Sequence, residues 1–246
     1  MIRDIIPKNL ARLHSTEEQL RQKAHSMIAA DDRLQLHLAV TEAAMDLADT
    51  LRQFNSSDED LKVAVVLGMR TFNAFAASTR LTLSGYHQNS ALILRDVMET
   101  VFLLDLFAGD PPLIERWRFA DKKARMKDFS PLKVREALDA RDGITSKKRF
   151  EMYELFSELA GHPNMKSSWM MRPQKDGDAV IGPFMEATSL EAVISEMGRL
   201  AVQVGEQLDR FFPTDWGIPS RIAFAKLKQN WINSFYPTAA RPDAAT

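Results

Sequence analysis

Apolar residues recur every three or four positions along most of the chain, which is the spacing of one face of an α-helix. The pattern is clearest between residues 61 and 83, where Leu61, Val65, Phe72 and Phe75 share a face. The same spacing predicts helices over about 15–54 (with a break near Asp31–Asp32), 57–84, 90–109, 112–128, 131–141, 146–161, 189–211 and 219–235.

Capping signals suggest where these helices begin and end. Ser15 is followed three residues later by Glu18, which is a capping-box pattern, and Ser57 precedes a run of acidic residues that the helix dipole favours. Gly85 in "SGYHQN" is expected to end its helix in the left-handed conformation. The chain therefore alternates helices with short, well-marked connections.

Residues 163–187 do not have a helical pattern. The "KDGD" run at 175–178 could turn a short hairpin, in which Pro173 would restrict its strand to a sheet edge. We therefore expect an all-α single helical-bundle domain of about seven to nine helices, with one long loop or small hairpin at 163–187. Its parts are an N-terminal helical segment (1–56), a central core with the long loop (57–187), a C-terminal helical segment (188–236) and a disordered tail (237–246).

The segment 90–109, "SALILRDVMETVFLLDLFAG", is the most apolar of the chain. It carries four ionisable residues, and each would cost a few kcal/mol at the centre of a bilayer. We therefore interpret it as a buried helix rather than a membrane span. Its apolar residues point almost all round, so neighbouring elements must cover most of its surface. The four ionisable residues are Arg95, Asp96, Glu99 and Asp105.

Arg95 and Glu99 are four residues apart and share a helix face halfway along this segment. A buried charge without a partner costs several kcal/mol, so each is expected to have one. Two interpretations stay open. The two side chains satisfy each other or brace a neighbouring helix, or they line a cleft in which Arg95 binds an anion and Glu99 orients it.

A second candidate site lies in "YELFSELAGHPN", residues 153–164. Tyr153, Ser157 and Gly161 share a helix face, and His162 stands at the C-terminal end, where the helix dipole favours a protonated imidazole. His162 either caps the last carbonyl groups or serves as an acid, a base or a phosphate contact near Arg95.

The charge distribution is uneven. The 246 residues carry a net charge of −1, but residues 111–149 contain twelve Lys and Arg against six Asp and Glu. Basic side chains interleaved with aromatic ones can follow a phosphate backbone and stack on bases. The alternative is that the aromatic residues face the core while the cations are solvated. The candidate RNA-binding residues are Arg116, Trp117, Arg118, Lys122, Lys123 and Arg125.

Several classes of chemistry are disfavoured. The chain has no cysteine, its five histidines are scattered, and no histidine follows a Glu by three residues, so we expect no metal site and no cofactor. His14, His25 and His37 fall on amphipathic helices and are interpreted as surface or boundary residues. No export signal is evident, which leads us to expect a cytoplasmic protein without membrane association.

A stretch "G-Y-x-x-x-S-A-x-x-L-R-x-x-x-E" opens the buried helix, and "Y-x-x-x-S-x-x-x-x-H-P" follows before a loop that ends in "G-P". Over about residues 60–185 the chain resembles uncharacterised bacterial helical proteins of domain-of-unknown-function families on the fringe of the HEPN superfamily. The resemblance implies an all-helical, often dimeric protein. Many HEPN proteins are metal-independent ribonucleases of toxin–antitoxin and antiphage systems, and others are binding or partner modules.

The catalytic HEPN signature is an arginine and a later histidine with four to six residues between them. Arg80 and His87 fit this spacing, but about one such match is expected by chance in a chain of this length. We therefore assign the pair no role. The hypothesis is instead an RNA-binding protein or ribonuclease that uses Arg95, Glu99 and His162 as its catalytic residues with the basic segment. The alternative is a non-enzymatic module that binds a protein partner or a second copy of itself.

Overall fold

Ten α-helices make up most of residues 6–237, which are the residues that the computed structural model describes. No β-strand occurs in this range, so the expected all-α fold is confirmed. The elements are α1 Lys8–Ala29, α2 Asp32–Arg52, α3 Glu59–Leu83, α4 His87–Gly109, α5 Pro112–Phe119, α6 Lys122–Asp128, α7 Pro131–Asp142, α8 Lys148–Phe156, the π-helical turn η2 Ser157–Gly161, the 3-10 helix η3 Met165–Met171, α9 Ala187–Asp209 and α10 Ile218–Phe235.

The number of α-helices exceeds the expected seven to nine because the segment 112–128 is divided. Its backbone leaves the helical conformation at Ala120, and Asp121 caps a new helix by accepting a hydrogen bond from the backbone N–H of Ala124 at 2.7 Å. A side chain that satisfies an otherwise unpaired N–H group in this way makes a second start favourable.

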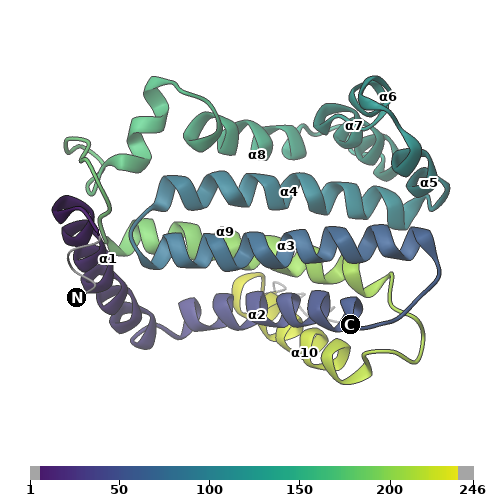
Figure 1. The fold of residues 1–246 in the computed structure, drawn as a ribbon, viewed down its shortest axis with the longest axis horizontal. Helices are drawn as coiled ribbons and strands as arrows, with labels where there is room; N and C mark the ends of the chain where they lie inside the picture. The colour runs from purple at the N-terminus through teal and green to yellow at the C-terminus, as the bar shows by residue number, and fades with distance from the viewer. Residues whose placement is uncertain (1–5, 238–246) are drawn as a thin grey trace, which may run out of the picture.

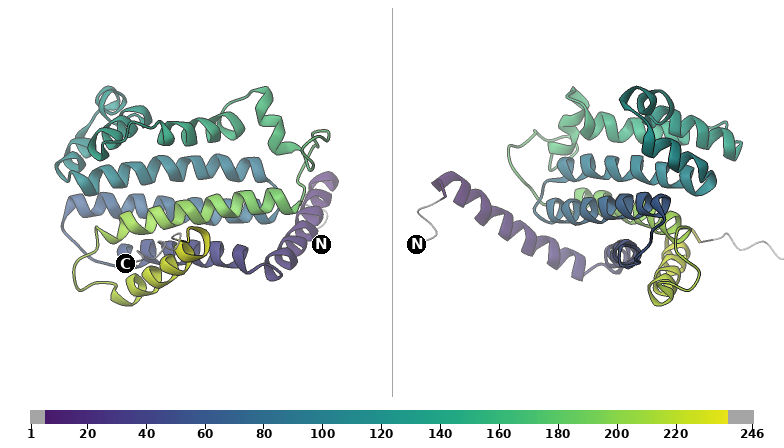
Figure 2. Two further views of the ribbon diagram at one scale, coloured as in Figure 1. Left: turned by 180° about the vertical axis from the view of Figure 1, so that it is seen from behind. Right: turned by 45° about the vertical axis from the view of Figure 1, so that its right-hand side comes forward.

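The helix α4 runs through the middle of the molecule (Figure 1). It contacts α3 and α9 on one side and α5, α7, α8, η2 and η3 on the other, while α2 packs on α3, α9 and α10. This confirms that neighbours cover the apolar helix on most sides. We call α2, α3, α4, α9 and α10 the inner bundle, and α5–α8 with η2 and η3 the outer layer. Figure 2 shows α1 extending away from one end of the inner bundle.

Two predicted helix starts are wrong. Ser15 lies inside α1, which begins at Lys8, and its hydroxyl donates to the carbonyl of Ala11 at 3.1 Å. The cap of α3 is Asp58 rather than Ser57, because the Asp58 carboxylate accepts hydrogen bonds from two backbone N–H groups of the first turn. The expected left-handed glycine is confirmed at Gly85, which has a φ of 87°.

His37 is buried, which corrects its interpretation as a surface or boundary residue. It lies in α2 and accepts a hydrogen bond at Nδ1 from the indole N–H of Trp231 in α10, at 2.8 Å. The ring of Phe235 stacks on it with centroids 4.1 Å apart. Gly198 in α9 makes room for the imidazole, because a Cβ at this position would lie 2.5 Å from Nδ1. His14 and His25 are exposed, as expected.

The long connection 163–187 contains η3 and a loop, but not the hairpin that the sequence allowed. A turn forms at Gln174–Gly177, where the expected "KDGD" run begins, with a backbone hydrogen bond of 3.0 Å. Only one bond joins the segments on either side, from the N–H of Val180 to the carbonyl of Met171. Pro173 cannot donate to a ladder, which limits further pairing.

None of the helices within residues 6–237 is both long enough and apolar enough to cross a bilayer. This agrees with the interpretation of residues 90–109 as a buried helix. Of the tail expected to be disordered, residues 238–246 lie outside the described part of the chain.

Candidate functional site

Arg95 and Glu99 form the expected pair on α4. Nη2 of Arg95 lies 3.1 Å from Oε1 of Glu99, and both side chains are mostly buried. The pair faces the outer layer, where α8 and η2 pack against α4. The first requirement of both interpretations, a partly buried ion pair in the middle of the helix, is therefore met.

The helix face that carries Tyr153 and Ser157 supplies further partners for Arg95. Its Nε donates to the Ser157 hydroxyl at 2.9 Å, and its Nη2 donates to the Tyr153 hydroxyl. The guanidinium also lies over the Tyr153 ring, 4.8 Å from the centroid. Two helical segments that are distant in the sequence are thus joined by one arginine.

A second arginine, Arg135 of α7, belongs to the same cluster. Its side chain is 95% buried, with 5% of its surface exposed, and its guanidinium lies 3.9 Å from the centroid of the Tyr153 ring. No described residue accepts a hydrogen bond from it, and its Nε and Nη1 are buried. The sequence pattern gave no sign of this residue, because one Arg among the many basic residues of 111–149 looks like any other.

Glu99 is the only carboxylate paired with this cluster among the described residues. Burial raises its pKa above the usual range, and the charge of Asp96 acts in the same direction. Arg95, Arg135 and a hydrogen bond from the Tyr153 hydroxyl oppose the increase without cancelling it. A carboxyl group with a raised pKa exchanges its proton closer to neutral pH, which is a property of groups that take part in proton transfer or ligand binding.

Glu99 also lines a groove of about 360 Å³ between α3, α4, α5 and α7. Trp117, Val134 and the ion pair between Arg70 and Asp96 are on the walls of this groove. Trp117 packs against the core residue Phe107 with ring centroids 5.8 Å apart. The polar cluster is therefore adjacent to an open groove that extends toward the basic segment.

His162 lies at the end of η2, as expected, but it is exposed and no hydrogen bond or ion pair joins it to Arg95 within the described residues. Its backbone N–H closes the π-helical turn on the carbonyl of Ser157 at 2.9 Å. The link to Arg95 is indirect, through Gly161, where a Cβ would lie 3.4 Å from Cδ of Arg95. The imidazole opens onto a separate, shallow groove that also includes Gln88.

The basic segment forms the surface of α5 and α6. Trp117 faces the core, whereas Phe119 is 74% exposed, so the expectation that both aromatics pack inward holds for the first only. Arg118 forms ion pairs with Glu59 and Asp60 of α3, and its guanidinium lies 4.8 Å from the centre of the Phe119 ring.

The other cations of this segment differ in how far they are neutralised. Arg116 is 3.4 Å from Asp128, and Arg125 donates two hydrogen bonds to the carbonyl of Ala120. Lys122 and Lys123 are exposed and form no ion pair within residues 6–237. The unneutralised charge is therefore next to the exposed Phe119.

Arg80 and His87 do not form a site. His87 is buried, its Nε2 lies 3.1 Å from the carbonyl of Phe184, and Arg80 is exposed. Burial lowers the pKa of His87 to about 4, so its imidazole is neutral at pH 7. This supports the decision to give the pair no role.

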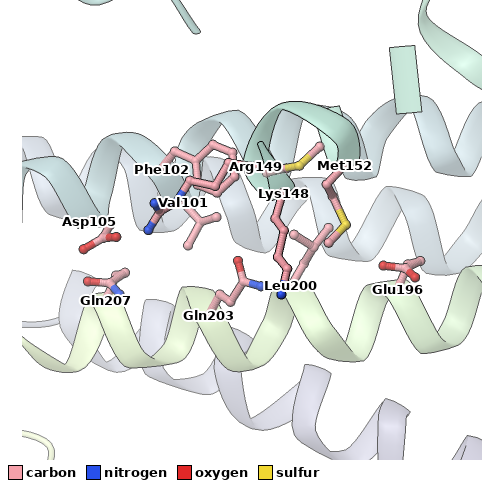
Figure 3. Close-up of a pocket in the computed structure, with 11 residues that line it drawn as sticks. Val101, Phe102, Asp105, Lys148, Arg149, Met152, Glu196, Leu200, Gln203 and Gln207 are labelled. Atoms are coloured by element: carbon pink, nitrogen blue, oxygen red, sulfur yellow. The ribbon is translucent and has the colours of Figure 1, made fainter. Parts of the chain in front are cut away.

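A further groove, of about 300 Å³, lies between α4, α8 and α9 and was not anticipated from the sequence. Figure 3 shows Lys148 reaching from α8 toward α9, and Asp105 of α4 facing Gln207 of α9. Burial raises the pKa of Glu196 at its edge, while Arg199 opposes the increase. None of the residues predicted from the sequence lines this groove.

Within the described residues, no group of three or more His, Asp or Glu side chains is arranged to hold a metal ion. When the chain is compared with protein-family models, with curated proteins and with solved structures, none of the three comparisons gives a match.

Proposed function

We propose that this protein binds single-stranded RNA on the surface of α5 and α6. The observation that carries the proposal is the exposed ring of Phe119, which lies beside Arg118 and is followed on α6 by Lys122 and Lys123. A large apolar ring that is 74% exposed contributes nothing to the core. A ring that a base can stack on, surrounded by cations, is typical of proteins that bind single strands without strict sequence preference.

The charges of the segment support this proposal. Lys122 and Lys123 have no acidic partner within residues 6–237, so they can replace the counterions of two phosphates. The guanidinium of Arg118 lies near the Phe119 ring, where it extends the flat surface available to a base. Arg116 and Arg125 are exposed on the same two helices and enlarge the basic surface.

The binding test uses a labelled pool of mixed single-stranded RNA and measures affinity over a series of salt concentrations. Phe119→Ala should weaken binding by about 5- to 100-fold, the range measured for losing one stacked base. Replacing Lys122 and Lys123 by Ala should lower the slope of log K against log salt by about 1.4, since each phosphate contact to a single strand contributes about 0.7.

The matched control replaces two lysines elsewhere, Lys8 and Lys226. Both are exposed and neither forms an ion pair within the described residues. This variant carries the same change in net charge but should keep the wild-type affinity and salt slope. If both double-lysine variants bound RNA equally weakly, binding would depend only on the overall charge of the protein, and the proposed surface would be wrong.

Metal-independent cleavage of the RNA is an additional hypothesis and rests on Arg95 and His162. In such a reaction the histidine would accept the proton of the 2′-hydroxyl as its oxygen bonds to phosphorus. The bond from phosphorus to the 5′-oxygen would break, water would protonate that leaving oxygen, and the arginine would stabilise the negative charge on the phosphoryl oxygens. The same RNA pool, incubated with a chelator, tests it with Arg95→Ala and His162→Ala variants whose folding is checked by circular dichroism. Cleavage that survives in either folded variant excludes this pair as the catalytic site.

The alternative function, a protein interaction module, is favoured by a different surface. Met165, Trp169 and Ile181 are large apolar residues of η3 and the loop that follows it, and all three are strongly exposed. Sedimentation of the purified chain measures self-association, and Trp169→Ala should reduce it if this surface joins two copies. RNA binding that depends on Phe119, together with a monomer at all concentrations, would exclude the self-association form of this alternative.

A further inference from the structure

Arg135 has the most unusual environment of the described charged residues. Its side chain is 95% buried, yet its buried Nε and Nη1 donate no hydrogen bond to any residue within 6–237, and no carboxylate in this range forms an ion pair with it. Arginine keeps its charge at all physiological pH values. A buried charge without a partner is strongly destabilising, so an acceptor from outside the chain would relieve a substantial cost.

The cluster that Arg135 forms with Arg95 is positive even after Glu99 is counted. Arg95 and Arg135 lie over the same Tyr153 ring, at 4.8 and 3.9 Å from its centroid. Glu99 is paired with Arg95 at 3.1 Å. With Glu99 ionised, the cluster has one uncompensated positive charge, and protonation of Glu99 would leave two.

We infer that Arg135, with Arg95 beside it, binds a phosphate group. A guanidinium carries five N–H donors, and the three on the buried Nε and Nη1 of Arg135 have no acceptor among the described residues. A phosphate presents three oxygens to such a donor set, whereas a carboxylate presents two. The geometry of arginine suits both anions, but the number of unsatisfied donors and the buried positive charge favour the larger and more highly charged one.

The groove between α3, α4, α5 and α7 borders this cluster through Glu99, which is paired with Arg95. Val134, the residue before Arg135 in the sequence, lines this groove as well as Glu99. The volume of the groove, about 360 Å³, exceeds that of a phosphate group alone. Trp117 also lines the same groove. The phosphate can therefore belong to inorganic phosphate, to a mononucleotide or to the end of an RNA strand, all of which present the same oxygens.

The site is independent of the proposed RNA surface on α5 and α6, so the two inferences can fail separately. Thermal unfolding in a phosphate-free buffer gives the first readout. Inorganic phosphate should raise the Tm of the wild type by on the order of 5–10 °C at a hundredfold excess over its Kd, and potassium chloride at equal ionic strength should not. Phe119→Ala should leave this response unchanged.

Arg135→Met separates ligand binding from packing. Methionine keeps much of the length of the side chain over Tyr153 and removes the unpaired charge. We expect this variant to have a higher Tm than the wild type without phosphate and no response to phosphate. The inference would be overturned if Arg135→Met had a lower Tm than the wild type in phosphate-free buffer and phosphate did not change the Tm of the wild type. The guanidinium would then serve packing alone.

Two more variants control for folding. Arg149 of α8 is also mostly buried, but it is paired with Asp139 and Asp142 at 2.5 Å each. Arg149→Met should lower the Tm and keep the phosphate response. Arg135→Lys keeps the charge without the planar fork, so it should fold and bind phosphate more weakly. Wild-type affinity in Arg135→Lys or in Arg135→Met contradicts the assignment.

The source of the phosphate is resolved by calorimetric titration of the wild type. Adenosine monophosphate is compared with adenosine, and a 5′-phosphorylated RNA oligonucleotide with its 5′-hydroxyl form. Tighter binding of the phosphorylated member of a pair, lost in Arg135→Met, supports the site and identifies its source. Acetate that binds as tightly as phosphate would overturn the preference for phosphate.

Discussion

The inner bundle and the outer layer differ in how their buried polar side chains are paired. The buried histidine, serine and threonine side chains of the inner bundle each have at least one hydrogen-bond partner, although Nδ1 of His87 has none. In the inner bundle, the hydroxyls of Ser78 and Thr82 both lie within hydrogen-bond distance of the Ser90 hydroxyl, at 2.6 and 2.7 Å. His37 is likewise bonded to Trp231. In the outer layer, Arg135 is equally buried and has no partner among the described residues.

The two regions also differ in their apolar surface. Within residues 6–237, eighteen large apolar residues are exposed, and eleven of them lie between residues 119 and 181, although this stretch is about a quarter of the chain. Exposed apolar residues that gather in one region mark surfaces that contact other molecules. We therefore propose that the inner bundle provides most of the stability, and that the outer layer is the part of the molecule that contacts other molecules.

The largest expected effect is on the free energy of unfolding, when a phenylalanine of each region is replaced by alanine. Phe75 of α3 is 1% exposed and belongs to the main core, whereas Phe119 is 74% exposed. Phe75→Ala should lower the free energy of unfolding by about 3–5 kcal/mol, because it removes buried surface and leaves a cavity. Phe119→Ala should change it by less than about 0.5 kcal/mol. Urea denaturation measures both, and equal losses would contradict the division.

Acid should destabilise the inner bundle through its two buried histidines. Burial lowers the pKa of His37 and of His87 from 6.5 to about 4, with Arg199 and Arg33 adding to the effect at His37. A group with a lowered pKa in the folded state binds its proton more readily when unfolded. Its stabilising contribution is therefore complete above pH 6.5 and is lost as the pH falls toward 4.

Each histidine should account for a loss of about 3 kcal/mol over this range. Urea denaturation of the wild type between pH 7.5 and 4.5 measures the total, and a His37→Gln variant should lose stability less steeply with acid. His25→Gln, on the exposed surface of α1, has the same change of side chain and serves as the control. A wild type and His37→Gln variant with parallel pH profiles would show that His37 does not contribute to the acid sensitivity.

The parts of the site that were predictable from the sequence depend on local spacing. Arg95 and Glu99 are one helical turn apart, and so are Tyr153 and Ser157, so each pair was placed on one face before any tertiary structure was known. That the two faces meet depends on how α8 and η2 pack on α4, which the spacing does not encode.

Arg135 and His37 were missed for a related reason. Both lie in segments whose local pattern is that of an ordinary amphipathic helix, which usually places Arg and His at the surface. The burial of His37 is due to Trp231, which is 194 residues away in the sequence. Arg135 is covered because α7 packs on α4 beside Tyr153. A single sequence contains no local signal of such distant contacts.

The smallest expected effect concerns the start of α3, where the inner bundle meets Arg118 of the outer layer. The carboxylate of Asp58 accepts hydrogen bonds from the N–H groups of Asp60 and Leu61, at 2.8 and 3.2 Å. Asp58→Ala should lower the free energy of unfolding by about 1 kcal/mol, because two backbone N–H groups of the first helical turn lose their acceptor. Ser57→Ala should change it by less than about 0.5 kcal/mol.

Asp58→Asn separates the hydrogen bond from the charge at this helix end. Asparagine is as good an N-cap as aspartate, but it lacks the negative charge that the helix dipole favours. The free energy of unfolding that Asp58→Asn loses should therefore lie between the losses of Asp58→Ala and Ser57→Ala. Urea denaturation at low salt measures all three. A larger loss for Ser57→Ala than for Asp58→Ala would reinstate the cap that the sequence pattern predicted, one residue earlier.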